Sequence, residues 1–385
     1  MEKYNFLCFV GLAGLSRPIF GAFLSLRTAR SGGIEGFSSR SGRLAPPLSV
    51  ADLGHPVALA ILVSLLLATV AIAALRRWGA RLPQARPTDR SLHDRPVSRV
   101  GGLAIWAGFI PIAMALSPVA PIGTPVWFVA WLAVAAVSLI DDARGVHPVP
   151  RLAVHGAAAL FVALALWSPV PSPLTAPWGL EVALVALALA WSANLFNFMD
   201  GNDGLAAMMA ACGFAAYAIA AWLAGAPAQG YAALAAAIVP FLVVNLPPAR
   251  AFMGDVGAVP LGFLAAVFGI AGWRAGIWPS WFPLLVFLPF IVDATATLLR
   301  RGLRGERVWE AHRDHYYQRF HQMGARHGGT LALYCGLMAG VGATAVGVLA
   351  HNPDGGWWAL AAWSGLIAAL FARIDYHWSR KRFPP

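Results

Sequence analysis

Five aspartates stand at the ends of long apolar runs, where a carboxylate can bind a metal ion or move a proton. Asp141 and Asp142 are adjacent, Asp200 and Asp203 lie close together, and Asp255 opens an apolar run. The chain contains only seventeen Asp and Glu residues. Ionised groups in or near a bilayer are costly, so such carboxylates are candidates for function. Each one alone could be a solvated helix end or a helix cap, but five on one side favour a shared site.

Asp141 and Asp142 repel each other, so at least one of them needs a cation or a shared proton to stay ionised. On a helix, neighbouring side chains diverge by about 100°. We therefore expect the two carboxylates to play different parts, one taking a proton and the other holding metal or substrate.

A second group of polar residues recurs every three positions. It consists of Asn194, Asn197, Asp200 and Asp203. If one helix continues through all four, they form a single polar stripe at its end. A stripe of this kind is not explained by core packing and favours a binding surface.

Asp255 follows a break in the apolar pattern, because Asn245 precedes Pro247 and Pro248. Magnesium prefers one or two carboxylates together with phosphate oxygens and water. Asp255 is therefore a candidate magnesium ligand. A Gly-Asp pair also occurs in intramembrane aspartyl proteases, but those place a glycine where this chain has Phe252, which disfavours that reading.

The basic segment 300–327 adds histidines to this set. His312 and His315 are three residues apart with Arg313 between them, and Arg is suited to bidentate phosphate binding. Membrane topology alone explains most of the arginines, whereas the two histidines are candidates for direct phosphate contact. An earlier basic loop also combines a histidine, His93, with arginines.

The elements that must position these residues are membrane helices. Hydrophobic residues make up 59% and charged residues 12% of the 385 residues, which excludes a water-soluble globule. We predict an all-α polytopic membrane protein with about eleven transmembrane helices. The apolar runs cover residues 55–75, 101–120, 124–140, 152–168, 179–199, 204–225, 229–247, 256–273, 277–299, 329–350 and 356–374.

The positive residues orient the array. After residue 54, every Lys and Arg except Arg274 falls in alternate loops, which places those loops in the cytoplasm. This predicts a membrane domain over 55–375 and a basic cytoplasmic tail over 376–385. Residues 1–54 are an N-terminal extension to which no role is assigned. Basic loops facing anionic lipid headgroups or a phosphorylated substrate explain the net charge of +11, so nucleic acid is not expected as a partner.

Five separated stretches of this chain resemble the polyprenyl-phosphate N-acetylhexosamine-1-phosphate transferases, glycosyltransferase family 4. The last of them resembles the branch that initiates O-antigen. The stretches are residues 93–102, Asp141-Asp142 with Arg151, residues 194–206, residues 245–257, and Asp293 to Arg319.

The resemblance implies roles for the acidic residues. Asp255, with Asp142, would bind Mg²⁺, for which Mn²⁺ can substitute, and Asp141 and Asp142 would activate or position the lipid phosphate. Asp200 would be catalytic, and Asp203 would bind substrate.

It implies further roles on the nucleotide side. Phe252 would pack against uracil, and His312 and His315 would act at the diphosphate. The remaining residues expected to bind substrate are His93, Asn197, Asn245 and Arg313.

The implied reaction joins UDP-N-acetylhexosamine and undecaprenyl phosphate into a polyprenyl-diphosphate-sugar, with release of UMP. It would initiate O-antigen, as part of lipopolysaccharide, or another cell-envelope glycan. The enzyme would lie in the bacterial inner membrane with its active site facing the cytoplasm, and family members suggest a homodimer. Separation of the two histidines by Arg313 and Asp314 disfavours a muramoyl-pentapeptide donor.

The competing hypothesis is a polytopic transporter of lipid or nucleotide sugar. Transporters place polar residues near the bilayer midplane and often carry inverted repeats. Here the polar residues lie at one face and no repeat is found, which favours the transferase.

Overall fold

The structure is a computed structural model that describes residues 50–78, 84–85, 97–99, 101–116, 124–167, 176–307 and 312–382. The predicted N-terminal extension, apart from its last residues, and His93 lie outside these ranges.

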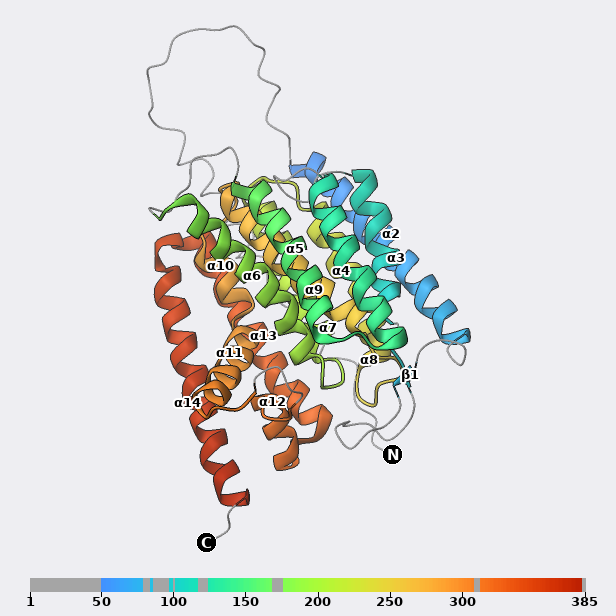
Figure 1. The fold of residues 1–385 in the computed structure, drawn as a ribbon. Coiled ribbons are helices and arrows are strands. Elements are labelled where there is room, and N and C mark those ends of the chain that lie inside the picture. Colours follow the sequence, from blue (N-terminus) through green and yellow to red (C-terminus); the bar gives the residue numbers. More distant parts are fainter. Residues whose placement is uncertain are drawn as a thin grey trace, which may run out of the picture. The chain divides into compact units, whose positions relative to one another are not determined.

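The described chain is almost entirely helical (Figure 1). A two-residue antiparallel pair, β1 (Gln84–Ala85) with β2 (Val97–Ser98), precedes α3. The π-helix η4 (His321–Ala325) joins α12 to α13, and the 3₁₀ turn η5 (Pro353–Gly355) precedes α14. The α-helices are α2 (Val50–Arg77), α3 (Gly102–Leu116), α4 (Thr124–Arg144), α5 (Pro148–Trp167), α6 (Trp178–Met199), α7 (Leu205–Leu223), α8 (Gln229–Asn245), α9 (Asp255–Arg274), α10 (Trp281–Val286), α11 (Leu288–Leu303), α12 (Tyr316–Phe320), α13 (Arg326–His351) and α14 (Gly356–Arg382).

The predicted class, an all-α polytopic membrane protein, is confirmed. Within the described ranges, eight helical segments are long and apolar enough to cross a membrane, and α3 and α8 are shorter apolar helices. Each predicted apolar run corresponds to a helix, but the run 277–299 is divided into α10 and α11 at Phe287. Pro289 lies in the first turn of α11, where a missing N–H is tolerated, but it cannot continue a helix from α10. Eleven crossings stays a prediction.

Helix α14 is longer than the sequence predicts. The apolar run ends at residue 374, whereas the helix continues through the predicted tail to Arg382. Its 27 residues span about 40 Å, more than the roughly 30 Å of a hydrocarbon core. The last turns of α14 therefore have to reach beyond the apolar layer.

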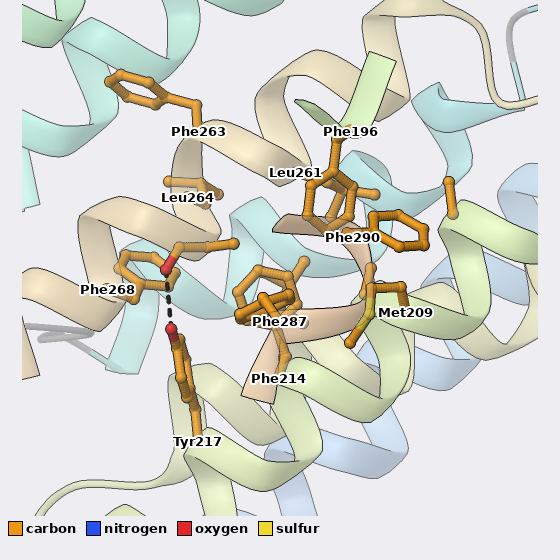
Figure 2. Close-up of a cluster of buried hydrophobic side chains, with 14 of the residues drawn as sticks. Phe196, Met209, Phe214, Tyr217, Leu261, Phe263, Leu264, Phe268, Phe287 and Phe290 are labelled. Atoms are coloured by element: carbon orange, nitrogen blue, oxygen red, sulfur yellow. Dashed lines mark hydrogen bonds between the residues drawn. The ribbon is translucent and has the colours of Figure 1, made fainter. Parts of the chain in front are cut away.

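Helix α9 lies at the centre of the bundle, because it is apolar on all sides and packs against α4 and α6. Beside it, aromatic side chains from several helices fill the interior (Figure 2). The rings of Phe196 and Phe290 meet edge to face with centroids 5.3 Å apart, a favoured aromatic arrangement. The hydroxyl of Tyr217 donates to the carbonyl of Ala265 at 3.1 Å. This core fixes the helices whose ends carry the candidate site.

Candidate active site

The start of α9 is built so that Asp255 stands at the helix N-terminus. The preceding Gly254 has φ +71°, and a Cβ there would lie 1.8 Å from the carbonyl oxygen of Arg99. The N–H groups of Gly101 and Gly102 donate to the carbonyls just before it, at residues 252 and 253, both at 2.9 Å. The segment before α3 thus fixes the segment that presents Asp255.

Asp142 caps this same helix. It lies in the last turn of α4, and its two oxygens accept the backbone N–H groups of Asp255 at 3.1 Å and Val256 at 2.9 Å. The first N–H groups of a helix have no partner within the helix, and a negative charge there is stabilising. Asp142 therefore holds Asp255 in place.

Arg151, in the first turn of α5, joins two carboxylates. Its Nη1 donates to Asp141 and also to Asp255, the latter at 3.0 Å. The other oxygen of Asp141 accepts the N–H of Val146 at 2.6 Å. Asp141 and Asp142 thus have different partners, as expected for adjacent residues on a helix.

Asp141, Asp142 and Asp255 form an acidic group at this end of the bundle. Asp200 lies beside this group, at the C-cap of α6. Burial, followed by the negative charges of Asp255 and Asp142, raises the pKa of its carboxyl well above the usual value. The effect of those charges indicates that Asp200 belongs to the same acidic group. Burial and neighbouring negative charge both favour the neutral form of a carboxyl.

The expected four-residue polar stripe does not form, because the helix does not continue. Helix α6 ends at Met199, and Gly204, with φ +78°, precedes the start of α7. Asn194 and Asn197 remain on α6, where both are half-buried. Asp203 lies in the turn between α6 and α7 instead.

Asp203 is buried and makes contacts within the protein. One oxygen accepts the N–H of Ala249 at 3.0 Å, and the backbone N–H of Asp203 donates to Nδ1 of His327 at 3.2 Å. These bonds link the turn between α6 and α7 to two other segments. The contact of Asp203 with substrate stays a prediction.

Asn245 has a similar position. Its amide oxygen accepts the N–H of Gly204 at 2.9 Å and its amide nitrogen donates to the carbonyl of Ala251 at 2.9 Å. Only 3% of Asn245 is exposed. The side chain therefore positions two loops, whereas the half-buried Phe252 nearby keeps part of its ring surface accessible.

The predicted histidines lie just before α12, and a buried carboxylate anchors them. Asp293 of α11 accepts the backbone N–H groups of Tyr316 at 2.9 Å and Tyr317 at 3.0 Å, and also the hydroxyl of Tyr334. The rings of His312 and His315 have centroids 4.9 Å apart. Asp293 thus fixes the start of α12, next to the segment that carries both imidazoles.

This histidine segment packs against the end of α6. The hydroxyl of Tyr317 donates to the carbonyl of Phe198 at 3.0 Å, and the rings of Phe198 and His315 are stacked at 5.9 Å. Phe198 is two residues before Asp200. The structure therefore brings the histidines to the same end of the bundle as the acidic group.

Burial, followed by the neighbouring charges of His315 and Arg301, lowers the pKa of His312 to about 4. The imidazole is therefore neutral at physiological pH. Its Nδ1 accepts the N–H of Asp314 at 3.3 Å, which leaves Nε2 to carry the proton. His312 can donate a hydrogen bond to a phosphate oxygen. The neighbouring Arg313 is half-buried.

The carboxylate oxygens of the acidic group are possible metal ligands. Among the described residues, no three or more His, Cys, Asp and Glu side chains are grouped to hold a metal ion. Magnesium does not require such a group, since phosphate and water complete its shell. Asp141 and Asp255 both offer hard oxygens to one cationic atom of Arg151. A donor set of carboxylate oxygens fits Mg²⁺ or Mn²⁺.

Two residues of this site gained no role from the sequence. Arg151 belongs to one of the five stretches that carry the family resemblance. The sequence spacing does not show that its side chain joins Asp141 to Asp255. Asp293 is a carboxylate inside an apolar run, and a buried charge needs hydrogen-bond donors. The rule predicts hydrogen-bond donors around Asp293, but it does not identify α12 as the element that supplies them.

Comparison with known proteins identifies similar sequences. Residues 124–273 match the family model described as Glycosyl transferase family 4. The chain is 33% identical over 257 residues to the phospho-N-acetylmuramoyl-pentapeptide-transferase of Synechococcus sp., covering 59% of this chain and 69% of the relative. It is 32% identical over 232 residues to the protein of that name in Moorella thermoacetica, covering 54% and 71%.

A further relative comes from another branch of these enzymes. The decaprenyl-phosphate N-acetylglucosaminephosphotransferase of Mycobacterium tuberculosis is 27% identical over 325 residues, covering 73% of this chain and 80% of the relative. The family-model match covers the helices that carry the acidic group. The chain therefore belongs to glycosyl transferase family 4, the superfamily of polyprenyl-phosphate N-acetylhexosamine-1-phosphate transferases.

Proposed function

We propose that this transferase moves N-acetylhexosamine-1-phosphate from a UDP-sugar to undecaprenyl phosphate. The products are a polyprenyl-diphosphate-sugar and UMP. The observation that carries the proposal is the acidic group at one end of the bundle, where Arg151 joins Asp141 to Asp255 and Asp142 caps α9. A relative whose name specifies decaprenyl phosphate and N-acetylglucosamine supports this substrate class.

The acceptor phosphate would enter beside Asp141 and Arg151. Arg151 offers a guanidinium suited to phosphate oxygens, and Asp141 orients the phosphate and accepts its remaining proton. One oxygen of the acceptor then bonds to the β-phosphorus of the donor. The bond from that phosphorus to the oxygen bridging to UMP breaks, and UMP leaves with the electron pair. A two-step route through an aspartyl-phosphate gives the same products.

The donor would lie between the acidic group and the histidine segment. Phe252 provides a ring face for uracil, and Asn197 and Arg313 lie on the nucleotide side. His312, neutral at physiological pH, donates a hydrogen bond to the phosphate that carries the sugar. His315 sits behind it, against the ring of Phe198.

Asp255 is the carboxylate that would hold Mg²⁺ or Mn²⁺, and Asp142 would contribute by fixing Asp255 or as a further ligand. When bound, this ion offsets charge on the diphosphate and on the leaving UMP. Asp200, at the C-cap of α6, would be a further catalytic carboxyl beside the diphosphate.

The cellular setting is also part of the proposal. The basic loops lie at the end that carries the site, and the positive-inside rule supports a cytoplasmic position for that end. The protein would lie in a bacterial inner membrane, as a homodimer, and would initiate O-antigen or a related envelope glycan. The lipid acceptor would arrive by diffusion within the bilayer.

The test uses the full chain in nanodiscs with undecaprenyl phosphate, Mg²⁺ and a panel of UDP-N-acetylhexosamines, and measures release of UMP. We expect release with at least one donor and its loss in Asp255→Asn. Asp354→Asn, an exposed aspartate in η5, is the matched control and should keep the wild-type rate. A wild-type chain that releases no UMP from any donor would contradict the proposal and favour a transporter. Near-normal turnover in Asp255→Asn would contradict the metal assignment.

A further inference from the structure

The final helix carries a carboxylate that collects donors from two other elements. Asp375 of α14 accepts Nη1 of Arg300 at 2.6 Å and 2.5 Å, Nη1 of Arg319 at 2.7 Å and the hydroxyl of Tyr316 at 3.0 Å. Arg300 belongs to α11, and Tyr316 and Arg319 belong to α12. One side chain thus joins three helices, which lie close together in Figure 1.

Ring contacts extend the same junction. Tyr316 stacks on Phe371, one turn before Asp375, with centroids 3.8 Å apart and planes 4° from parallel. The guanidinium of Arg319 lies 5.3 Å from the centre of the Tyr316 ring, and Arg300 donates to the Tyr316 hydroxyl at 2.9 Å. One face of α12 is therefore docked on α14 through a stacked ring and a shared carboxylate.

Helix α12 begins where the candidate histidines end. His315 immediately precedes Tyr316, and its carbonyl accepts the N–H of Arg319 at 2.9 Å. Asp293 holds the backbone of this helix start from the other side. The segment that presents the imidazoles is thus fixed between one carboxylate on α11 and one on α14.

The exposed fractions of Asp375 and Arg319 show which side chain would be most affected by the loss of Asp375. The side chain of Asp375 is 28% exposed, whereas that of Arg319 is 4% exposed. The other carboxylate near Arg319 is Asp314 at 3.9 Å, which is too far for a hydrogen bond. Without Asp375, Arg319 would be a buried cation with poor compensation, which is costly. Relief of that cost requires movement of α12.

We infer that Asp375 is a positioning residue for His312 and His315. Through Asp375, the end of α14 holds the segment that carries these histidines on the donor side of the site. This inference rests on the proposed function, because it takes the histidines to act on the donor diphosphate. It gives a role to the part of α14 that extends beyond the predicted span. Asp375 itself touches neither substrate in this scheme.

The experiment compares Asp375→Asn and Asp375→Glu with the matched control Asp354→Asn, in nanodiscs and at a temperature where all are folded. For Asp375→Asn we expect a kcat about 10- to 100-fold lower and a raised KM for the UDP-sugar, corresponding to about 1.4–2.7 kcal/mol in the rate term. The KM for undecaprenyl phosphate should stay unchanged, because Asp141 and Arg151, on the proposed acceptor side, bond to each other, to Val146 and to Asp255 rather than to α12. Asp375→Glu should restore part of the rate by restoring the charge.

A second readout does not depend on activity. Hydrogen–deuterium exchange over residues 312–320 should become faster in Asp375→Asn and stay at the wild-type level in Asp354→Asn. Unchanged exchange there, or unchanged kcat and donor KM in an active protein, would overturn the inference. A lower thermal midpoint with both KM values unchanged would also overturn it, since that result indicates a merely structural contact. A wild-type chain that releases no UMP would instead overturn the proposed function, and the exchange result would still decide whether Asp375 orders this segment.

Discussion

Replacing Asp142 by Asn separates the two roles that a carboxylate can play at this site. In the structure each oxygen of Asp142 accepts one backbone N–H at the start of α9. An asparagine keeps one acceptor oxygen, so either Asp255 or Val256 loses its partner. A hydrogen bond to a charged group contributes about 1.5–3 kcal/mol, and the charge at the helix N-terminus adds about 0.3–1 kcal/mol.

The expected loss is therefore about 2–4 kcal/mol in the free energy that holds Asp255 in place. If all of it appears in the transition state, kcat/KM falls about 30- to 900-fold. UMP release by Asp142→Asn gives the rate, and hydrogen–deuterium exchange over residues 253–260 reports the loosened helix start.

One result would refute this reasoning. If Asp142→Asn loses more than about 10⁴-fold in rate while exchange at the start of α9 stays at the wild-type level, then Asp142 acts directly on metal or substrate. A wild-type rate together with faster exchange would show that Asp255 does not need its cap. Asp354→Asn again serves as the matched control.

Three further substitutions test the geometry around the site. Asn245→Ala removes two buried hydrogen bonds and should destabilise the protein by about 2–4 kcal/mol, seen as a lower thermal midpoint in detergent with an unchanged donor KM. Gly254→Ala would bring a Cβ within 1.8 Å of the Arg99 carbonyl at φ +71°, so gel filtration should show little folded protein. Asp200→Asn removes a carboxyl whose pKa is raised in the folded state. Ionising that carboxyl opposes folding at pH values above its unfolded pKa, so the variant should have the higher thermal midpoint at pH 8, and this gain should shrink as the pH falls toward that unfolded value.

The sequence predicts the helices well because the length of an apolar run is enough to identify a membrane helix. It misses the division at Phe287, because a proline inside an apolar run does not show whether the helix bends or stops. It also ends α14 too early, since the charged residues after 374 indicate the loss of membrane contact but not the end of the helix.

The site could be predicted in part. The placement of Asp141, Asp142, Asp200 and Asp255 at helix ends follows from the apolar pattern, and the structure brings these four residues together. Their partners could not be predicted, because Arg151 and Asp255 are 104 residues apart in the chain. Such pairs depend on how the helices pack.

Polar residues near the site show a second limit. Asp203 and Asn245 have the same residue types and setting as a ligand-binding group, yet their side chains bond to backbone groups of neighbouring turns. Turns between membrane helices leave N–H and C=O groups without helical partners, and a side chain that satisfies them looks the same in sequence as one that binds substrate.

The aromatic cluster of Figure 2 has a consequence for where a reaction product would go. Phe196, Phe214, Phe268 and Phe290 are all fully buried and occupy the middle of the helix array. A charged diphosphate head group has no polar lining to follow between these rings. A sugar lipid made at the acidic end would therefore find no passage to the opposite leaflet through this part of the core.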